Sequence, residues 1–257
     1  MSGVNTKSFA LFEEFIAATD NTYVFNGETS VQGVVVLLEI IKEMGLNPMI
    51  TAELREGIFS LFNVELINMP DLHNSRFIFT PNHVSDMDAI ILGLLSTNIR
   101  IVSKTDWTNN EKLRRFLDIH YNLCGLDRAS VSSLRSLLSD AINYFNDSNE
   151  SRHYLVFSQG TISDFNNNSP ERISAIAQKI SQKTDVAIVN LFVEQASLYH
   201  PTRIVFDEPL KLSRGDDFRE LWLEREIAMQ NALQPPARLP KLSQKHMNNN
   251  KPGDLFF

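Results

Sequence analysis

The stretch Phe77-Ile78-Phe79-Thr80-Pro81-Asn82-His83-Val84-Ser85-Asp86-Met87-Asp88 is the part of the chain around which the rest is arranged. It begins with apolar and aromatic residues, which are typical of a buried strand. Thr80-Pro81 ends that strand, because proline donates no hydrogen bond to a sheet and keeps its predecessor extended. The apolar run from Ala89 to Leu95 then predicts a largely buried helix. His83 therefore lies on a turn between strand and helix, a usual place for chemistry in an α/β protein.

The spacing of His83 and Asp88 has a geometric consequence. Residues five apart on a straight helix point about 140° away from each other, so the two side chains meet only if His83 precedes the helix. If Ser85 is the N-cap, Asp88 stands at N3, where a side chain folds back over the cap. The carboxylate can then hold one imidazole nitrogen and leave the other to accept a proton from a substrate hydroxyl. The alternative is that Asp86 and Asp88 only complement the helix dipole and that His83 is an ordinary loop residue.

Short apolar runs alternate with helical patterns from Ser75 onward, which predicts an α/β fold: a mostly parallel central sheet flanked by helices, with an N-terminal helical layer before it. The expected strands are 76–80, 100–103, 123–127, 154–157, 186–192 and 203–206, and the expected helices are 7–19, 30–44, 51–61, 86–95, 110–119, 130–145, 170–181 and 216–233. We expect an N-terminal helical region over 1–65, an α/β domain over 66–234 and an extended C-terminal tail over 235–257.

Composition narrows the class of protein. The 257 residues are 43% hydrophobic, enough for a core, and the net charge of −7 argues against a nucleic-acid-binding surface. Cys124 is the single cysteine, so the chain has neither an internal disulfide nor a Cys-x-x-Cys metal site. The first residues lack the pattern of a secretory signal, and the apolar run Val34 to Leu38 is too short to span a membrane. We therefore expect a cytoplasmic protein, with peripheral membrane contact left open.

Two further motifs follow expected strands. In Ser158-Gln159-Gly160-Thr161 the glycine lets the backbone approach a ligand, and free N–H groups there can hold an anion, although a glycine after a strand is often only a turn. In Gly125-Leu126-Asp127-Arg128 the arginine suits phosphate binding, although a surface ion pair is its commoner fate. Lys104 ends another strand and would join them at the same sheet edge.

Together these pieces resemble the glycerolipid acyltransferase family, which includes the glycerol-3-phosphate and lysophosphatidic acid acyltransferases. Asn82-His83 through Asp88 matches the family's N-H-x4-D motif. Lys104 with Gly125…Arg128 resembles its second block, Phe157 to Thr161 its F-P-E-G-T-R block, and Val186 to Asn190 its late V-P-I-V-P strand. The resemblance covers about residues 75–210, with all blocks in the family's order.

The resemblance implies an O-acyltransferase of lipid metabolism in which His83 removes the proton of the acceptor hydroxyl, assisted by Asp88. It implies an acyl thioester as co-substrate, on coenzyme A or acyl carrier protein, and neither a metal nor another cofactor. Main-chain donors near Gly160 or after His83 would stabilise the oxyanion. The substrate-binding residues that it implies are Asn82, Lys104, Arg128, Gln159, Gly160 and Thr161. A basic cluster is a candidate docking site for the acidic carrier protein, or simply a solvated helix face: Lys112, Arg114 and Arg115.

Departures from the family pattern gather in the third block. Ser158 stands in place of its proline, Gln159 in place of its glutamate and Ile162 in place of its arginine. The last two changes remove a charge-assisted contact to an anionic acceptor, typically worth about 1.5–3 kcal/mol. We therefore expect an acceptor other than an ordinary glycerol phosphate, such as a neutral alcohol or an amine. Pairing of Lys104 and Arg128 with Asp106 or Asp127 beside them would weaken the preference for anions further; left unpaired, the two cations could still bind phosphate. The competing hypothesis for the whole chain is a non-catalytic binding or partner protein with an acyltransferase fold.

Overall fold

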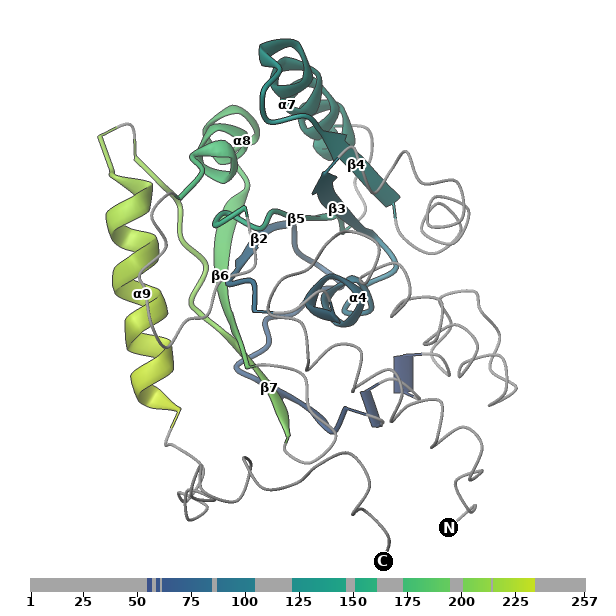
Figure 1. Ribbon diagram of the computed structural model, residues 1–257, viewed down its shortest axis with the longest axis vertical. Helices are drawn as coiled ribbons and strands as arrows, with labels where there is room; N and C mark the ends of the chain where they lie inside the picture. Colours follow the sequence, from purple (N-terminus) through teal and green to yellow (C-terminus); the bar gives the residue numbers. More distant parts are fainter. Residues whose placement is uncertain are drawn as a thin grey trace, which may run out of the picture.

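A seven-stranded sheet carries the part of the chain that the structure describes (Figure 1). The structure is a computed structural model. It describes residues 55–56, 59–60, 62–84, 87–104, 122–146, 151–160, 173–194, 201–213 and 215–233. The strands are β1 (Val64–Ile67), β2 (Phe77–Pro81), β3 (Ile99–Lys104), β4 (Asn122–Leu126), β5 (His153–Leu155), β6 (Ala187–Val193) and β7 (Thr202–Phe206). The helices are α4 (Met87–Gly93), α7 (Val131–Asn146), α8 (Ile176–Thr184) and α9 (Phe218–Ala232).

The strand order is β1-β7-β6-β2-β5-β3-β4. Every neighbouring pair is parallel except β6 and β7, which are antiparallel. The predicted mostly parallel sheet with flanking helices is therefore confirmed. β1 was not among the expected strands; it crosses the expected boundary between residues 65 and 66 and joins the sheet through β7.

Helices cover both faces of the sheet, since α9 and α4 lie on opposite sides of β6 (Figure 1). The face toward α7, α8 and α9 holds the larger core cluster, in which Ile78, Tyr154 and Trp222 are fully buried. On β2 all five residues are buried, as expected of a central strand covered on both faces. This strand ends immediately before Asn82 and His83, so the end of a fully buried strand carries the motif.

The helix expected over 170–181 begins only at Ile176, and the one expected over 216–233 is α9. Within the range 51–61, residues 55, 56, 59 and 60 are described and have helical backbone. Outside the described residues lie the helices expected over 7–19, 30–44 and 110–119, and the tail 235–257. No helix in the described part is both long and apolar enough to cross a membrane.

Candidate active site

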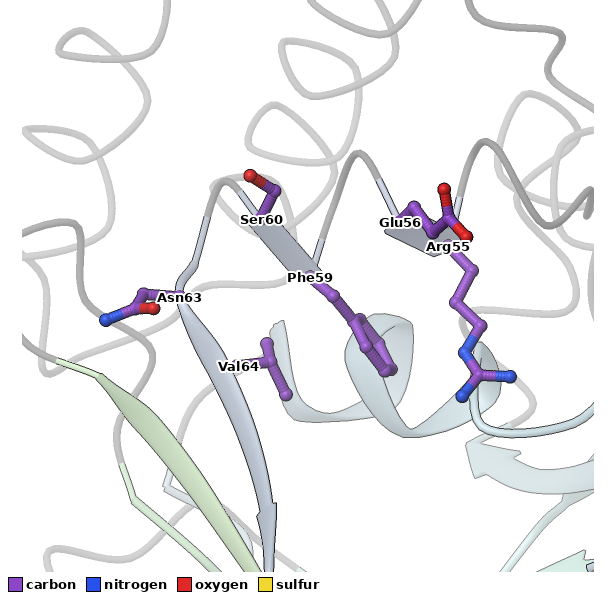
Figure 2. A pocket seen from close by; sticks show the side chains of 6 residues that line it. All are labelled: Arg55, Glu56, Phe59, Ser60, Asn63 and Val64. Carbon is purple, nitrogen blue, oxygen red and sulfur yellow. The ribbon is translucent and has the colours of Figure 1, made fainter.

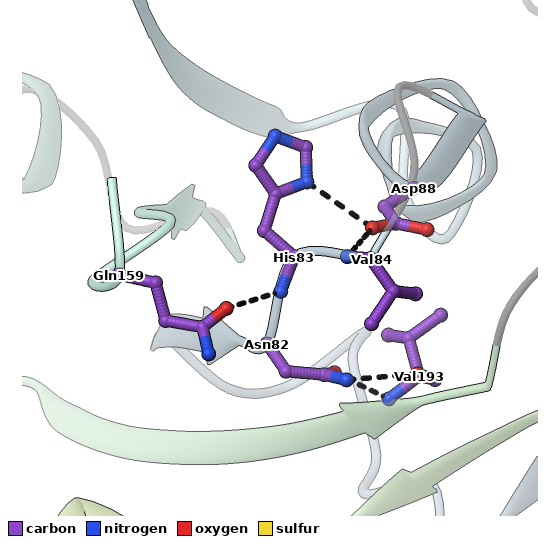
Figure 3. A network of polar contacts seen from close by, with 6 residues as sticks. All are labelled: Asn82, His83, Val84, Asp88, Gln159 and Val193. Carbon is purple, nitrogen blue, oxygen red and sulfur yellow. Dashed lines mark hydrogen bonds and ion pairs between the residues drawn. The ribbon is translucent and has the colours of Figure 1, made fainter. Parts of the chain in front are cut away.

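The loop that follows β2 is tethered to β6 through Asn82. Its main-chain N–H donates to the Leu191 carbonyl at 3.2 Å. Its side chain bonds Val193 twice, donating from Nδ2 to the carbonyl at 2.9 Å and accepting the N–H on Oδ1 at 2.6 Å (Figure 3). Asn82 is fully buried. It thus continues the β2–β6 pairing by one residue with a side chain in place of a main chain, and fixes where His83 begins.

His83 and Asp88 make the contact that their spacing predicts. The carboxylate Oδ2 lies 3.1 Å from His83 Nδ1 and accepts the Val84 N–H at 2.7 Å. Asp88 is in the first turn of α4, with its side chain fully buried, whereas the His83 side chain is 16% exposed. Because a carboxylate accepts, Nδ1 carries the hydrogen of the neutral ring and Nε2 keeps its lone pair. Figure 3 shows this second nitrogen pointing away from Asp88. Ser85, the expected cap, is outside the described residues.

The turn Phe157–Gly160 holds His83 from the other side. Gln159 Oε1 accepts the His83 N–H at 2.7 Å (Figure 3), and the Phe157 ring packs on the imidazole with centroids 4.2 Å apart. The Gly160 N–H closes the turn by donating to the Phe157 carbonyl at 2.9 Å. Gly160 has a φ of +74°, a conformation that glycine adopts without strain. The motif from Ser158 to Thr161 and the histidine motif are therefore in direct contact.

Arg128 reaches the same turn from the end of β4. A Cβ on Gly160 would lie 2.9 Å from Arg128 Nη1 and 3.0 Å from its Cζ, so only glycine admits the guanidinium this close. Burial lowers the pKa of Arg128 from its ordinary value, although a guanidinium stays charged at neutral pH. Of the two alternatives for Arg128, the ion pair with Asp127 is not formed. Asp127 Oδ1 instead accepts the Ala129 N–H at 2.9 Å, and no ion pair joins Arg128 to another described residue.

Of the remaining predicted site residues, Lys104 and Thr161, only the main chain of Lys104 is described. Lys104 ends β3 opposite Leu126, two residues before Arg128, and only its main chain is described. Thr161 lies outside the described residues, and so do Ile162 and the basic cluster of Lys112, Arg114 and Arg115.

Three of the main-chain N–H groups expected from the resemblance to hold the oxyanion are already occupied. The N–H groups of His83, Val84 and Gly160 donate to Gln159, Asp88 and Phe157, respectively. A donor that already has a good acceptor gains little from a developing oxyanion. Among the described groups near the turn, the Arg128 guanidinium is the charged donor. The buried Gln159 Nε2 also has no hydrogen-bond partner in the described part of the chain.

A buried polar layer on α9, behind β2, was missed by sequence reasoning. Trp222 Nε1 donates to the Thr80 carbonyl at 3.1 Å. One turn further, Glu226 is fully buried, and neither carboxyl oxygen has a hydrogen-bond partner in the described part of the chain. Burial and the neighbouring Asp207 raise the pKa of Glu226 well above its ordinary value, against a smaller opposing effect of the Asn82 main chain. Phe218, Trp222, Glu226 and Met229 share one buried helix stripe, and this spacing was the available signal.

A separate hollow of about 480 Å³ lies beside the start of β1 (Figure 2). Its lining residues are Arg55, Glu56, Phe59, Ser60, Asn63 and Val64. None of the residues predicted for the active site lines it, so we assign it no part in the chemistry. The described residues contain no group of three or more side chains suited to hold a metal ion.

Comparison with known proteins identifies the family and the fold. The family model described as Acyltransferase matches residues 63–194, just over half of the chain. A similar solved structure is the 1-acyl-sn-glycerophosphate (LPA) acyltransferase PlsC from Thermotoga maritima. It is 16% identical, with a TM-score of 0.52, and the match covers 90% of this chain and 99% of that one. No curated protein matches the chain.

The mostly parallel sheet with flanking helices is the fold class that the resemblance implies. The extent of the family match settles the assignment: the chain belongs to the Acyltransferase family. Its fold is that of the Thermotoga maritima enzyme.

Proposed function

We propose that the protein transfers an acyl group from a thioester donor, either acyl-coenzyme A or acyl carrier protein, to the hydroxyl or amine of an acceptor. His83 is the general base in this proposal, and Asp88 orients it. The observation that carries the proposal is the 3.1 Å contact between His83 Nδ1 and the buried Asp88 carboxylate, with the imidazole itself still partly exposed. This contact assigns Nδ1 to the protein and leaves Nε2 for the substrate.

The proposed reaction follows from that division of the ring. Nε2 accepts the acceptor O–H proton while the oxygen attacks the thioester carbonyl, and Asp88 stabilises the imidazolium that forms. The tetrahedral intermediate then expels the thiolate, which takes the proton from Nε2. The ester bond forms, the thioester bond breaks, and the histidine returns to its neutral form without an acyl-enzyme. The Arg128 guanidinium, the strong donor next to Gly160, supports a role in binding negative charge on the intermediate or on the acceptor.

The acceptor that this site supports carries an anionic group. The sequence predicted a neutral acceptor from Gln159 and Ile162, with internal pairing of Arg128 as a further reason. Arg128 makes no ion pair with Asp127, whose Oδ1 accepts the Ala129 N–H instead. Gln159 contributes no charge, so in the described part of the site the attraction for a phosphate depends on Arg128. We therefore propose a hydroxyl acceptor of the glycerol-phosphate or lysophosphatidate type, bound with fewer charged contacts than in the family pattern. Glycerol phosphates and lysophosphatidates place this reaction in lipid metabolism.

The test measures thiol release and acylated product with acyl-coenzyme A and with acyl carrier protein. Glycerol 3-phosphate, lysophosphatidate, neutral alcohols and amines compete as acceptors. We expect turnover by the wild-type protein, loss of at least a thousandfold in His83→Ala with the fold intact, and a preference for anionic acceptors that Arg128→Ala removes. Comparable turnover in His83→Ala would refute the base. No turnover with any donor and acceptor, but saturable acyl-donor binding, would support the non-catalytic alternative.

A further inference from the structure

The Phe157–Gly160 turn contacts both the main chain and the ring of His83. It is anchored next to β2, because the Val156 N–H donates to the Phe79 carbonyl at 2.9 Å and extends the β2–β5 pairing. From this anchor, Gln159 reaches the His83 N–H and Phe157 reaches the imidazole face. The turn therefore sets the position of the His83 backbone and the tilt of its ring together.

The orientation of the Gln159 amide follows from its partner. The His83 N–H is a donor, so the oxygen of the amide must face it, and the 2.7 Å distance marks a short bond. Gln159 is only 8% exposed, so water cannot readily replace the lost acceptor if the side chain is shortened or made apolar. The side chain that the sequence assigned to substrate binding thus has its acceptor end committed to the protein.

The charge of this side chain matters as much as its position. A carboxylate at position 159 would also accept the His83 N–H, but it would place a second negative charge beside the base. The charged or titratable groups near His83 in the described structure are Asp88, which contacts the ring, Arg128, which lies against Gly160 of the same turn, and Glu226, which lies by the main chain of Asn82. An added anion would favour the protonated imidazole, which cannot act as a base.

We propose that Gln159 is a positioning residue: its neutral amide fixes His83 through the main-chain N–H, and keeps the base unprotonated at lower pH than a carboxylate would. This inference rests on the proposed role of His83 and goes beyond it, because it makes residue 159 a determinant of the pH range of the enzyme.

Two variants separate the two parts of the proposal. Gln159→Met keeps the length and removes the acceptor; Gln159→Glu keeps the acceptor and adds a charge. Gln178→Met is the control for losing a glutamine-to-main-chain bond away from the site, because Gln178 Nε2 on α8 donates to the Asp216 carbonyl at 2.9 Å. All are measured with acyl-coenzyme A and lysophosphatidate, and by NMR of the full chain for the His83 amide exchange rate and the titration midpoint of the His83 ring.

For Gln159→Met we expect kcat to fall by about ten- to a hundredfold with both KM values within about threefold of wild type, and His83 amide exchange to accelerate at least tenfold. For Gln159→Glu we expect near-normal amide exchange, and an upward shift of about one pH unit in both the ring midpoint and the acid limb of the rate profile. An unchanged amide exchange rate in Gln159→Met, an unchanged midpoint in Gln159→Glu, or a rise in KM alone would overturn the inference. The NMR readings do not need turnover, so they test Gln159 even if His83→Ala shows that the proposed base is wrong.

Discussion

Replacing Asp88 by asparagine isolates the charge of the pair from its geometry. In the structure one oxygen, Oδ2, serves both His83 Nδ1 and the Val84 N–H. An asparagine with its oxygen in that place can still accept both bonds, but it carries no charge when the imidazolium forms. The substitution therefore tests whether Asp88 stabilises the transition state or only holds the loop.

The magnitude follows from the contact distance. With 3.1 Å between Nδ1 and Oδ2, the two charges are centred about 4 Å apart, which corresponds to about 4 kcal/mol at an effective dielectric constant near 20. If this attraction is present only in the transition state, its loss lowers kcat by about a thousandfold. KM should change little, because Asp88 is fully buried and does not reach the substrate.

The assay is steady-state thiol release together with thermal unfolding. Asp217→Asn is the control for losing a carboxylate at a helix start, because Asp217, the N-cap of α9, accepts the main-chain N–H groups of Arg219 and Glu220. We expect similar small losses of stability in both variants and a loss of kcat only in D88N. A D88N enzyme within tenfold of wild-type kcat would refute the electrostatic role and reduce Asp88 to a helix cap.

Three further predictions concern groups around this pair. Gly160→Ala should lower the free energy of unfolding by about 1–2 kcal/mol, because φ is +74° and its Cβ would meet Arg128, whereas Gly215→Ala, with open space around it, should be nearly neutral in the same urea titration. Burial lowers the pKa of His153 to about 4, so as the pH falls below 6.5 the unfolded chain binds a proton at this histidine before the folded protein does. The free energy of unfolding of wild type, relative to His153→Gln, should therefore drop by about 2 kcal/mol between pH 7 and 5. A constant difference would contradict this. The pKa of Glu226 is raised, so the folded protein keeps a proton on this carboxyl that the unfolded chain loses above pH 4.5. Glu226→Gln should therefore gain stability over wild type by up to about 1.4 kcal/mol per pH unit above that value. Equal pH dependences of the free energy of unfolding in the two proteins would show the carboxyl to be ionised.

Local sequence patterns predict most of the sheet, because its strands are short apolar runs bounded by turn residues. They miss β1, in which Glu65 interrupts the apolar residues and whose pairing with β7 joins residues about 140 positions apart. They also leave the strand order open, since alternation of strands and helices does not say that β2 lies between β6 and β5. The reversed direction of β6 relative to β7 is likewise a property of the assembled sheet.

In the site, too, contacts between residues close in the sequence can be predicted, whereas contacts between distant residues cannot. The His83–Asp88 contact is local, and capping geometry alone predicts it. The bond from His83 to Gln159 joins residues 76 apart, and it exists because β5 is the neighbour of β2. The burial of Glu226 is harder still to predict, since an acidic residue on a helix is ordinarily exposed to solvent. The only signal for it is the spacing of the buried residues along α9.

Stability and chemistry in this site depend on the same hydrogen bonds. Each of the three residues from Asn82 to Val84 is held by a different part of the fold. Asn82 bonds Val193 of β6, His83 bonds Gln159 of the Phe157–Gly160 turn, and Val84 bonds Asp88 of α4. Each bond satisfies a buried or partly buried group, so its loss costs stability, and each also fixes the imidazole, so its loss costs rate. A fall in activity after a substitution here is thus uninformative by itself. The control substitutions of Gln178 in α8 and of Asp217 at the start of α9 make the distinction possible. They remove bonds between a side chain and the main chain where no substrate is expected.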